Sequence, residues 1–431
     1  MNEMFISWIW GHRQLDRELR TESGEPLVVL HPGDPNRDSG PDFFNARLRI
    51  GDTTWAGNVE IHVVSSDWYR HGHDADPAYD RVILHVVHDA DRPVFQRNGE
   101  PVQTLVIRGK YPASIHDRYR KMMSGQDWIP CIRQLDPGQD FGFGLWAPAL
   151  AVERLESKSE AIKHQMTACG NDWEEAFYRH LAASFGFRTN SMPLELLAKS
   201  LPLKVIRRHC SSVFQVEALL FGQAGMLGKP FSDEFPQKLK KEYQFLRGKY
   251  DLKPLEDGLW KFLRLRPANF PTIRISQLAG FICRMEARFT GLLETGSLHE
   301  IGKALDIPAS AYWDDHYLFD RLSASRSKKM GEQSLNLLMI NGVAPFLFHY
   351  GREKGLPAIC ESILEFLSLA PGERNEQTER WRRAGFGAGN ALHSQALLHL
   401  KRNYCDMKRC LECRVGVRVL GEGEKGISNI E

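Results

Sequence analysis

The spacing of apolar residues changes at about residue 110, and this change limits the folds open to the chain. Before it, short β-branched runs (PLVVL, LRI, NVEIHVV, RVILHVV and VQTLVI) alternate with Gly, Pro, Asp and Asn, which is typical of a mixed sheet. After Tyr111, apolar residues recur about every 3.6 positions. We predict an α+β chain, with a mixed-sheet domain at 1–110, a connecting segment at 111–139 and an all-α domain at 140–431. One helix, from about Glu3 to Leu15, precedes the strands.

Composition narrows the class of protein further. A chain of 431 residues exceeds what one core usually serves, and a net charge of +2 excludes the bulk basicity of a generic polyanion binder. Apolar runs stay well below the roughly 20 residues of a membrane helix, and the start MNEMFISWIWGHRQ has an acid where a signal peptide requires base. Eight cysteines are too few for a disulfide scaffold. We expect a cytoplasmic protein without a membrane partner.

Acids and histidines gather between Gly40 and Asp74. The stretch ARLRIGDTTWAGNVEIHVV predicts a β-hairpin that turns near Gly51 and Asp52. Glu60 and His62 lie two residues apart in its second strand, hence on one face. Asp42 immediately precedes the first strand, so a hairpin can bring it beside Glu60.

Two carboxylates and a basic side chain at a strand end favour a metal site for phosphodiester hydrolysis. Asp42 and Glu60 supply the oxygen ligands preferred by Mg²⁺ or Mn²⁺, and His62 would orient or deprotonate the attacking water or bind the metal itself. His71 and His73, in the sequence HGH, can face the same site. If three histidines meet one acid, zinc or manganese suits the site better than magnesium.

Two further histidines follow on the strand RVILHVVH. Strand parity places His85 and His88 on opposite sheet faces, so at most one of them can join a centre on one face. For both, an ordinary core or surface imidazole is the simpler interpretation.

The pattern resembles the PD-(D/E)xK nuclease core, with PD at Pro41 and Asp42 and EIH at Glu60 to His62. The resemblance implies a restriction-endonuclease-like fold and a nucleic acid substrate. His62 replaces the Lys of that pattern, and a neutral imidazole does not reproduce a permanent positive charge. Some nucleases of this class carry a further acid on a leading helix, where Glu3 stands, although the helix dipole explains Glu3 equally well. Alternatively, the acids and histidines are structural and hydrogen-bond across a turn.

The expected helical domain contains an arginine-rich turn. WKFLRLRPANFPTIRISQLA places Arg264, Arg266 and Arg274 around a Pro-Asn-Pro turn between phenylalanines. Arginine forks beside aromatic rings suit phosphates and unstacked bases, so we predict these three residues to contact nucleic acid. The alternative is a helix-capping turn whose arginines bind carboxylates or carbonyls inside the domain.

A cysteine motif near the C-terminus predicts a second metal site. YCDMKRCLECRVG spaces Cys405, Cys410 and Cys413 by four and by two residues, and thiolates are the ligands of zinc and of iron–sulfur clusters. Cys131 can supply a fourth ligand from a distance, as in nucleases that staple their catalytic domain with a cluster. Alternatively, the cysteines are small buried hydrophobic residues.

Long blocks are similar to a bacterial family catalogued as domain of unknown function 2851, and this resemblance spans nearly the whole chain. They are HPGDPNRDSGPDFFNARL, WAGNVEIHVVSSDWYRHGHD, VILHVVHD, EALLFGQAGML, RLRPANFPTIRISQLA and CLECRVG. The family implies no activity, so function rests on the residues. They predict a metal-dependent nuclease or phosphodiesterase, with a non-catalytic scaffold or a zinc hydrolase of small substrates as alternatives.

Overall fold

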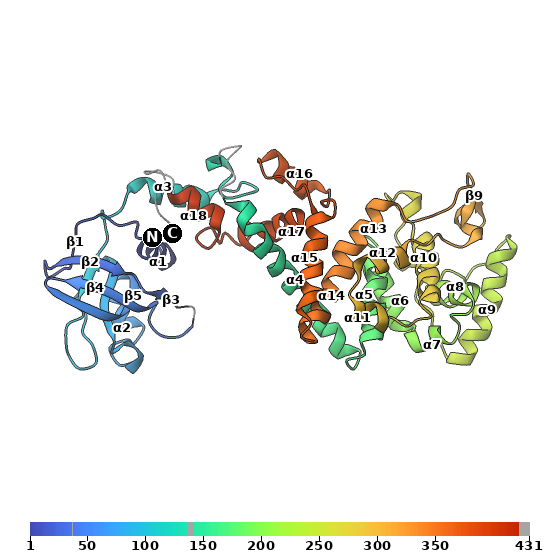
Figure 1. The fold of residues 1–431 in the computed structure, drawn as a ribbon, viewed down its shortest axis with the longest axis horizontal. Coiled ribbons are helices and arrows are strands. Elements are labelled where there is room, and N and C mark those ends of the chain that lie inside the picture. The colour runs from blue at the N-terminus through green and yellow to red at the C-terminus, as the bar shows by residue number, and fades with distance from the viewer. Residues whose placement is uncertain (37, 136–141, 422–431) are drawn as a thin grey trace. The chain divides into compact units, whose positions relative to one another are not determined.

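The computed structural model describes residues 1–36, 38–135 and 142–421 (Figure 1). The chain is α+β: an N-terminal mixed sheet precedes a long, mainly helical region. It divides into two compact units. Unit 1 comprises Met1–Phe143 and the chain from Leu400 onward, and unit 2 comprises Gly144–His399.

Unit 1 is built on a seven-stranded sheet in the order β1-β2-β4-β5-β6-β7, with β3 paired to β4. The strands are β1 (Leu19–Arg20), β2 (Pro26–His31), β3 (Asp34–Pro35), β4 (Phe43–Ile50), β5 (Thr53–Val64), β6 (Val82–Asp89) and β7 (Thr104–Val106).

The expected hairpin is confirmed. β4 pairs antiparallel with β5, Ile50 opposite Thr53, and the turn between them contains Gly51 at φ +56°, a conformation that glycine adopts without penalty. β6 instead pairs parallel with β5, Glu60 opposite His85, and β7 continues the parallel pairing.

Helix α1 (Glu3–Gly11) packs on β5 and β6 through an apolar face that includes Phe5, Ile6 and Ile9. The side chain of Asn2 caps its first turn by accepting from the Phe5 N–H at 3.0 Å. This helix was expected, but it ends four residues before Leu15.

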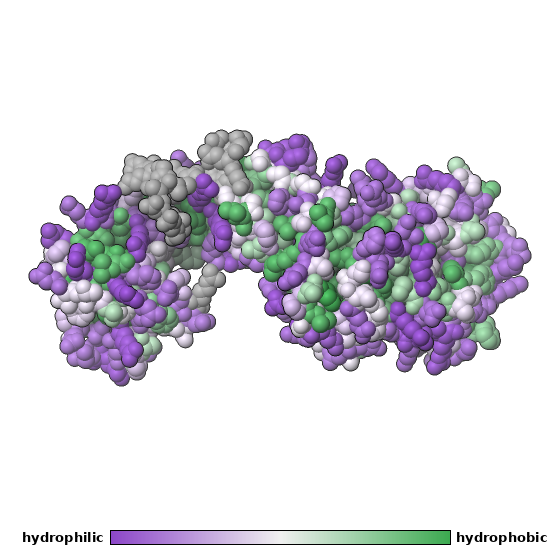
Figure 2. Space-filling view, in the orientation of Figure 1, coloured by the Kyte–Doolittle hydropathy of each residue, from purple (hydrophilic) through white to green (hydrophobic). Residues whose placement is uncertain are grey.

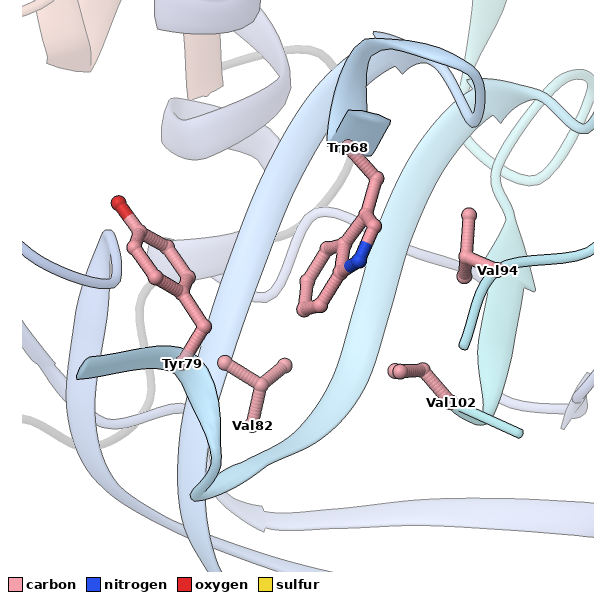
Figure 3. Packing of buried hydrophobic residues seen from close by; sticks show 5 residues of the cluster. All are labelled: Trp68, Tyr79, Val82, Val94 and Val102. Carbon is pink, nitrogen blue, oxygen red and sulfur yellow. The ribbon is translucent and has the colours of Figure 1, made fainter. Parts of the chain in front are cut away.

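The crossover from β5 to β6 runs through α2 (Asp67–Arg70) and the 3-10 turn Pro77–Tyr79. It is anchored by a small core whose members are Trp68, Tyr79, Val82, Val94 and Val102. Figure 3 shows the Trp68 indole in the middle of this cluster, with Tyr79 and Val82 on one side and Val94 and Val102 on the other. The indole N–H donates to the Phe95 carbonyl at 3.1 Å, so the crossover is fixed against the sheet.

The C-terminal segment returns to unit 1. The π-helical turn Leu400–Cys405 leads to α18 (Arg414–Gly421), which packs on α3 (Ala113–Ser124), and Arg118 of α3 donates to the Leu420 carbonyl at 2.7 Å. This division differs from the expected one, which placed all of 140–431 in the helical domain. Residues 136–139 of the expected connecting segment lie outside the described residues.

Unit 2 begins with the long helix α4 (Phe143–Ala168), whose first residue is counted with unit 1. A bundle of shorter helices follows. They are α5 (Trp173–Phe185), α6 (Ser191–Ser200), α7 (Leu203–Arg207), α8 (Val213–Gln223), α9 (Glu234–Tyr250), α10 (Pro271–Arg284), α11 (Thr290–Thr295), α12 (Leu298–Leu305), α13 (Glu332–Leu338), α14 (Ala344–Glu353), α15 (Pro357–Leu369), α16 (Glu376–Arg383) and α17 (Ala391–His399). A short hairpin, β8 (His316–Leu318) and β9 (Arg321–Leu322), completes it.

Apolar side chains of unit 2 form its interior, with Phe177, Phe281, Phe289 and Phe346 fully buried. Figure 2 shows that hydrophilic side chains predominate on the visible face of each unit. In the part of the chain that the structure describes, no helix combines the length and apolarity needed to span a membrane.

Candidate metal centre in unit 1

Asp42 lies immediately before β4, in a loop that hydrogen bonds from Asn36 organise. The side-chain amide of Asn36 donates to the carbonyls of Asp38, Ser39 and Pro41 at 3.1 to 3.2 Å. Gly40 in this loop has φ +103°, a conformation open mainly to glycine. The Asn36 N–H donates to the Asp42 carbonyl at 2.7 Å, so the loop delivers the Asp42 carboxylate to β5.

Asp42 and Glu60 lie side by side. The Ile61 N–H donates to Asp42 Oδ2 at 2.9 Å, and the Asp42 N–H donates to Glu60 Oε2 at 3.1 Å. Burial and the charge of Glu60 raise the pKa of Asp42 to about 7, and the charge of Glu3 adds to this effect. Glu3, at the start of α1, therefore also acts on Asp42.

Four imidazoles lie next to the carboxylates. His62 Nδ1 is 2.8 Å from His85 Nε2, and His62 Nε2 is 3.1 Å from His71 Nδ1. Glu60 Oε1 is 3.5 Å from His62 Nε2 and 3.2 Å from His73 Nε2. His62, His73 and His85 are buried, whereas His71 is exposed, so solvent reaches the cluster on the His71 side. We call Asp42, Glu60, His62, His71, His73 and His85 the histidine–carboxylate site.

The crossover positions two of these imidazoles. His71 directly follows α2, and its N–H donates to the Asp67 carbonyl. The His73 ring stacks on Tyr79, with ring centroids 3.7 Å apart, and meets the edge of Trp68 at 5.4 Å. The apolar core of the crossover therefore orients the His73 ring.

Electrostatics keep the central imidazoles neutral. Burial lowers the pKa of His62 to about 2, assisted by the charges of His85 and His73, and burial lowers the pKa of His85 to about 3, assisted by His73. Neutral imidazole is the form that binds metal ions. Among the described residues, His85 Nδ1 has no hydrogen-bond partner and His73 Nε2 has only the Glu60 carboxylate beside it, so both buried ring nitrogens remain available to a ligand.

The site can hold a divalent ion through nitrogen and oxygen atoms. One ligand atom from each of His62, His71 and His73 can be chosen so that all three lie within 4.8 Å of one another. Two nitrogens bound to one zinc ion are at most about 4.2 Å apart, since each lies about 2.1 Å from the metal. Small side-chain rotations would therefore allow the three imidazoles to share an ion, with Glu60 beside them.

His85 is the residue that sequence reasoning left out. Its neighbour in the parallel pairing is Glu60, so the two side chains point to the same face. The signal was present, because a strand, a short helical crossover and a second strand predict parallel neighbours. His88, of opposite parity, instead pairs with Asp89 at 2.8 Å.

The predicted nucleic-acid residues lie in unit 2 and differ in exposure. Arg264 and Arg266 are exposed. Arg274 is 2% exposed, and its guanidinium donates to Gln277 Oε1 at 2.8 Å and to Asn269 Oδ1 at 2.6 Å. Arg274 thus follows the alternative interpretation, in which the arginine binds partners inside the fold.

A family model described as "Protein of unknown function (DUF2851)" matches residues 3–376. The chain belongs to this family. The DUF2851 match includes the whole histidine–carboxylate site and Cys131, and it ends before the block CLECRVG. Neither the curated proteins nor the solved structures contain a significant match. The family assignment does not extend to PD-(D/E)xK nucleases, so that resemblance stays a prediction.

Proposed function

We propose that this DUF2851 protein is a metal-dependent phosphodiester hydrolase whose centre is the histidine–carboxylate site. The observation that carries the proposal is the convergence of three imidazole ligand atoms within 4.8 Å beside Glu60 and Asp42. A set rich in imidazole favours Mn²⁺ or Zn²⁺ over Mg²⁺. Of the two ions predicted from the carboxylates, Mn²⁺ is therefore preferred to Mg²⁺.

The position of each residue in the site suggests its role in the proposed reaction. His62, His71 and His73 would hold the ion, with Glu60 as an oxygen ligand or as the partner that orients His73. A bound ion lowers the pKa of a water and stabilises charge on a phosphoryl oxygen. Asp42 accepts a backbone hydrogen bond on one oxygen, and its other oxygen is available to take a proton from the water.

Arg70 supplies the positive charge that suits a phosphate substrate. Its guanidinium lies 2.9 Å from the buried carboxylate of Asp67, yet its side chain is 68% exposed. Its charge lowers the pKa of His62, after the larger effects of burial and the other histidines. We propose that Arg70 binds a phosphate oxygen and replaces part of the charge of the Lys that His62 displaces.

Nucleic acid is the substrate class that we propose, because phosphodiester chemistry and the exposed Arg264 and Arg266 both suit it. A zinc hydrolase of small substrates is a second candidate, since three histidines with an open position form a known catalytic zinc set.

The test measures metal content and hydrolysis in the full-length protein. Wild type, Glu60→Gln and His62→Asn are assayed with Mg²⁺, Mn²⁺ or Zn²⁺ on single- and double-stranded DNA, RNA, bis(p-nitrophenyl) phosphate and p-nitrophenyl acetate. We expect phosphodiester cleavage with Mn²⁺ or Zn²⁺ that falls roughly 100-fold in both variants.

His88→Asn is the matched control, because His88 lies on the same strand as His85 but outside the site. It should keep wild-type metal content and activity. Cleavage of the acetate ester alone would favour the second candidate. Wild-type protein that binds none of these metals and cleaves no substrate would support a scaffold and overturn the proposal.

A further inference from the structure

Unit 1 buries four cysteines in its interior. Cys131, Cys405, Cys410 and Cys413, here the thiol cluster, are 5 to 9% exposed and carry free thiols. The other four cysteines are more exposed and belong to unit 2. Buried cysteines that serve as small hydrophobic residues have no reason to converge, whereas these come from two segments far apart in the sequence.

The fold brings the two segments together by specific contacts. Cys131 follows α3, and the three other cysteines precede or begin the turn into α18, which packs on α3. Lys408, between Cys405 and Cys410, donates from Nζ to the carbonyls of Met123 and Gly125 at the end of α3.

The electrostatics of the thiols agree with these contacts. Burial raises the pKa of Cys131, and so do the charges of Cys413 and Cys410. Burial also raises the pKa of Cys405, followed by the charges of Cys413, Cys131 and Cys410. These effects agree with the packing of α18 on α3 and with the Lys408 contacts, which place Cys131 in the same part of unit 1 as the C-terminal cysteines.

The backbone around the cluster favours bound thiolates. The Gly416 N–H points at Cys413 Sγ at 3.5 Å, a contact that stabilises sulfur carrying negative charge. A side chain at position 416 would meet the Cys410 carbonyl at 2.3 Å, so glycine permits the tight turn that brings Cys410 and Cys413 together. Lys401 and Lys408 also act on Cys405 and Cys410 with positive charge.

We propose that the thiol cluster is a four-cysteine site for a thiophilic metal centre, either a zinc ion or an iron–sulfur cluster. Both require thiolate ligands held by a folded chain. Because the chain between Cys131 and Cys405 contains the whole of unit 2, the centre would close unit 1 by tying its returning segment to α3. This role is separate from hydrolysis at the histidine–carboxylate site.

The experiment uses full-length protein purified without oxygen, in a His62→Asn background that removes metal from the histidine–carboxylate site. Iron, acid-labile sulfide and zinc are measured per chain, together with visible absorption. Iron with sulfide would identify a cluster, and one zinc per chain would identify a zinc site. Either result supports the proposal if Cys131→Ser and Cys410→Ser each lose more than about 80% of that metal, as expected when one of four ligands is removed.

Cys169→Ser, a single cysteine of unit 2, is the matched control and should keep the metal. A second measurement needs no cysteine variant: Co²⁺ loaded into the His62→Asn protein reports thiolate ligands through sulfur-to-metal charge-transfer absorption. Absence of metal after reconstitution with iron and sulfide and with zinc, or metal that persists in both cysteine variants, would overturn the proposal. Absence of thiolate–cobalt absorption would do the same if the variants fail to fold.

Discussion

The histidine–carboxylate site of unit 1 and a polar network inside unit 2 make a useful comparison. In unit 2, Lys158 Nζ donates to Asn341 Oδ1 at 2.9 Å, Asn341 Nδ2 donates to Glu373 Oε2 at 3.1 Å, and Gln395 Nε2 donates to the same oxygen at 2.9 Å. Arg154 in turn donates to Gln395. Each of these donors meets an acceptor of complementary character.

The unit 1 site has a different organisation. Imidazole nitrogens face one another, two carboxylates lie side by side, and His85 Nδ1 lacks a hydrogen-bond partner among the described residues. In the unit 2 network each donor named above has a protein acceptor, so the network stabilises the fold without a ligand. The unit 1 site instead brings together the lone pairs of ring nitrogens and carboxylates, which a cation would satisfy. This difference is the reason that we propose a function for the unit 1 site and a structural role for the unit 2 network, although both contain polar groups that are at least partly buried.

Glu60→Gln should give the largest effect and test this distinction directly. The change removes a negative charge beside His62 and His73, so we expect metal affinity to fall about 10- to 100-fold and kcat/KM for a phosphodiester to fall roughly 100-fold. Isothermal titration with Mn²⁺ and steady-state kinetics measure both. Equal affinity in the variant and the wild type would remove Glu60 from the centre.

The metal-free protein should lose stability on acidification because of unit 1. His62 and His85 have folded pKa values near 2 and 3, against 6.5 when unfolded, so below pH 6.5 the unfolded chain binds more protons. Asp42, raised from 3.8 to about 7, acts in the opposite direction over most of this range. Two imidazoles against one carboxyl leave about 1.4 kcal/mol per pH unit near pH 5 and less near pH 6.5, where the unfolded imidazoles are half protonated. The stability lost between pH 6.5 and 5 is therefore about 1.5 kcal/mol.

Denaturant unfolding of apo protein at several pH values measures this slope, and His85→Asn should reduce it. His88→Asn serves as the control and should leave it unchanged. A stability that is flat from pH 6.5 to 5 would show that the imidazoles are not held neutral.

Glu373→Ala should destabilise unit 2 without touching the chemistry. Asn341 and Gln395 would each lose an acceptor, which we expect to lower the free energy of unfolding by about 1.5 kcal/mol, with activity and metal affinity unchanged. Glu376→Ala, which removes an exposed pair with Arg380, should change it by less than about 0.5 kcal/mol. Denaturant midpoints compare the two, and reduced metal affinity in Glu373→Ala would break the distinction between the clusters.

Arg70→Gln should give the smallest effect. Loss of one exposed phosphate contact should raise KM about 3- to 10-fold and change kcat less than about 2-fold. Arg97→Gln is the control, since Arg97, between β6 and β7, is also exposed but pairs with Asp80 of the crossover. The same kinetic assay applies, and an unchanged KM would leave Arg70 as only a partner of Asp67.

Local patterns predicted a good part of unit 1. The alternation in NVEIHVV placed Glu60 and His62 on one face, and the Gly51–Asp52 turn set the hairpin that brings Asp42 to β5. These features depend on strand parity and turn chemistry, which act over a few residues. His85 was left out because its place depends on which strand becomes the neighbour of β5.

Long-range packing decided the rest. Arg274 stands in the same arginine-rich run as Arg264, yet the fold buries it against Asn269 and Gln277. Helical periodicity after Tyr111 favoured a single C-terminal domain, although α18 returns to α3. A periodic pattern identifies an apolar face but not its partner.

The sequence by itself determined the order of sheet and helices, the hairpin, and the presence of ligand-forming residues, because these follow from interactions between near neighbours. Only the tertiary structure decided that His85 joins His62, that Arg274 is buried and that the C-terminal cysteines return to the unit that contains Cys131. Those contacts join segments far apart in the chain, and burial of apolar surface over the whole unit selects which segments pack together.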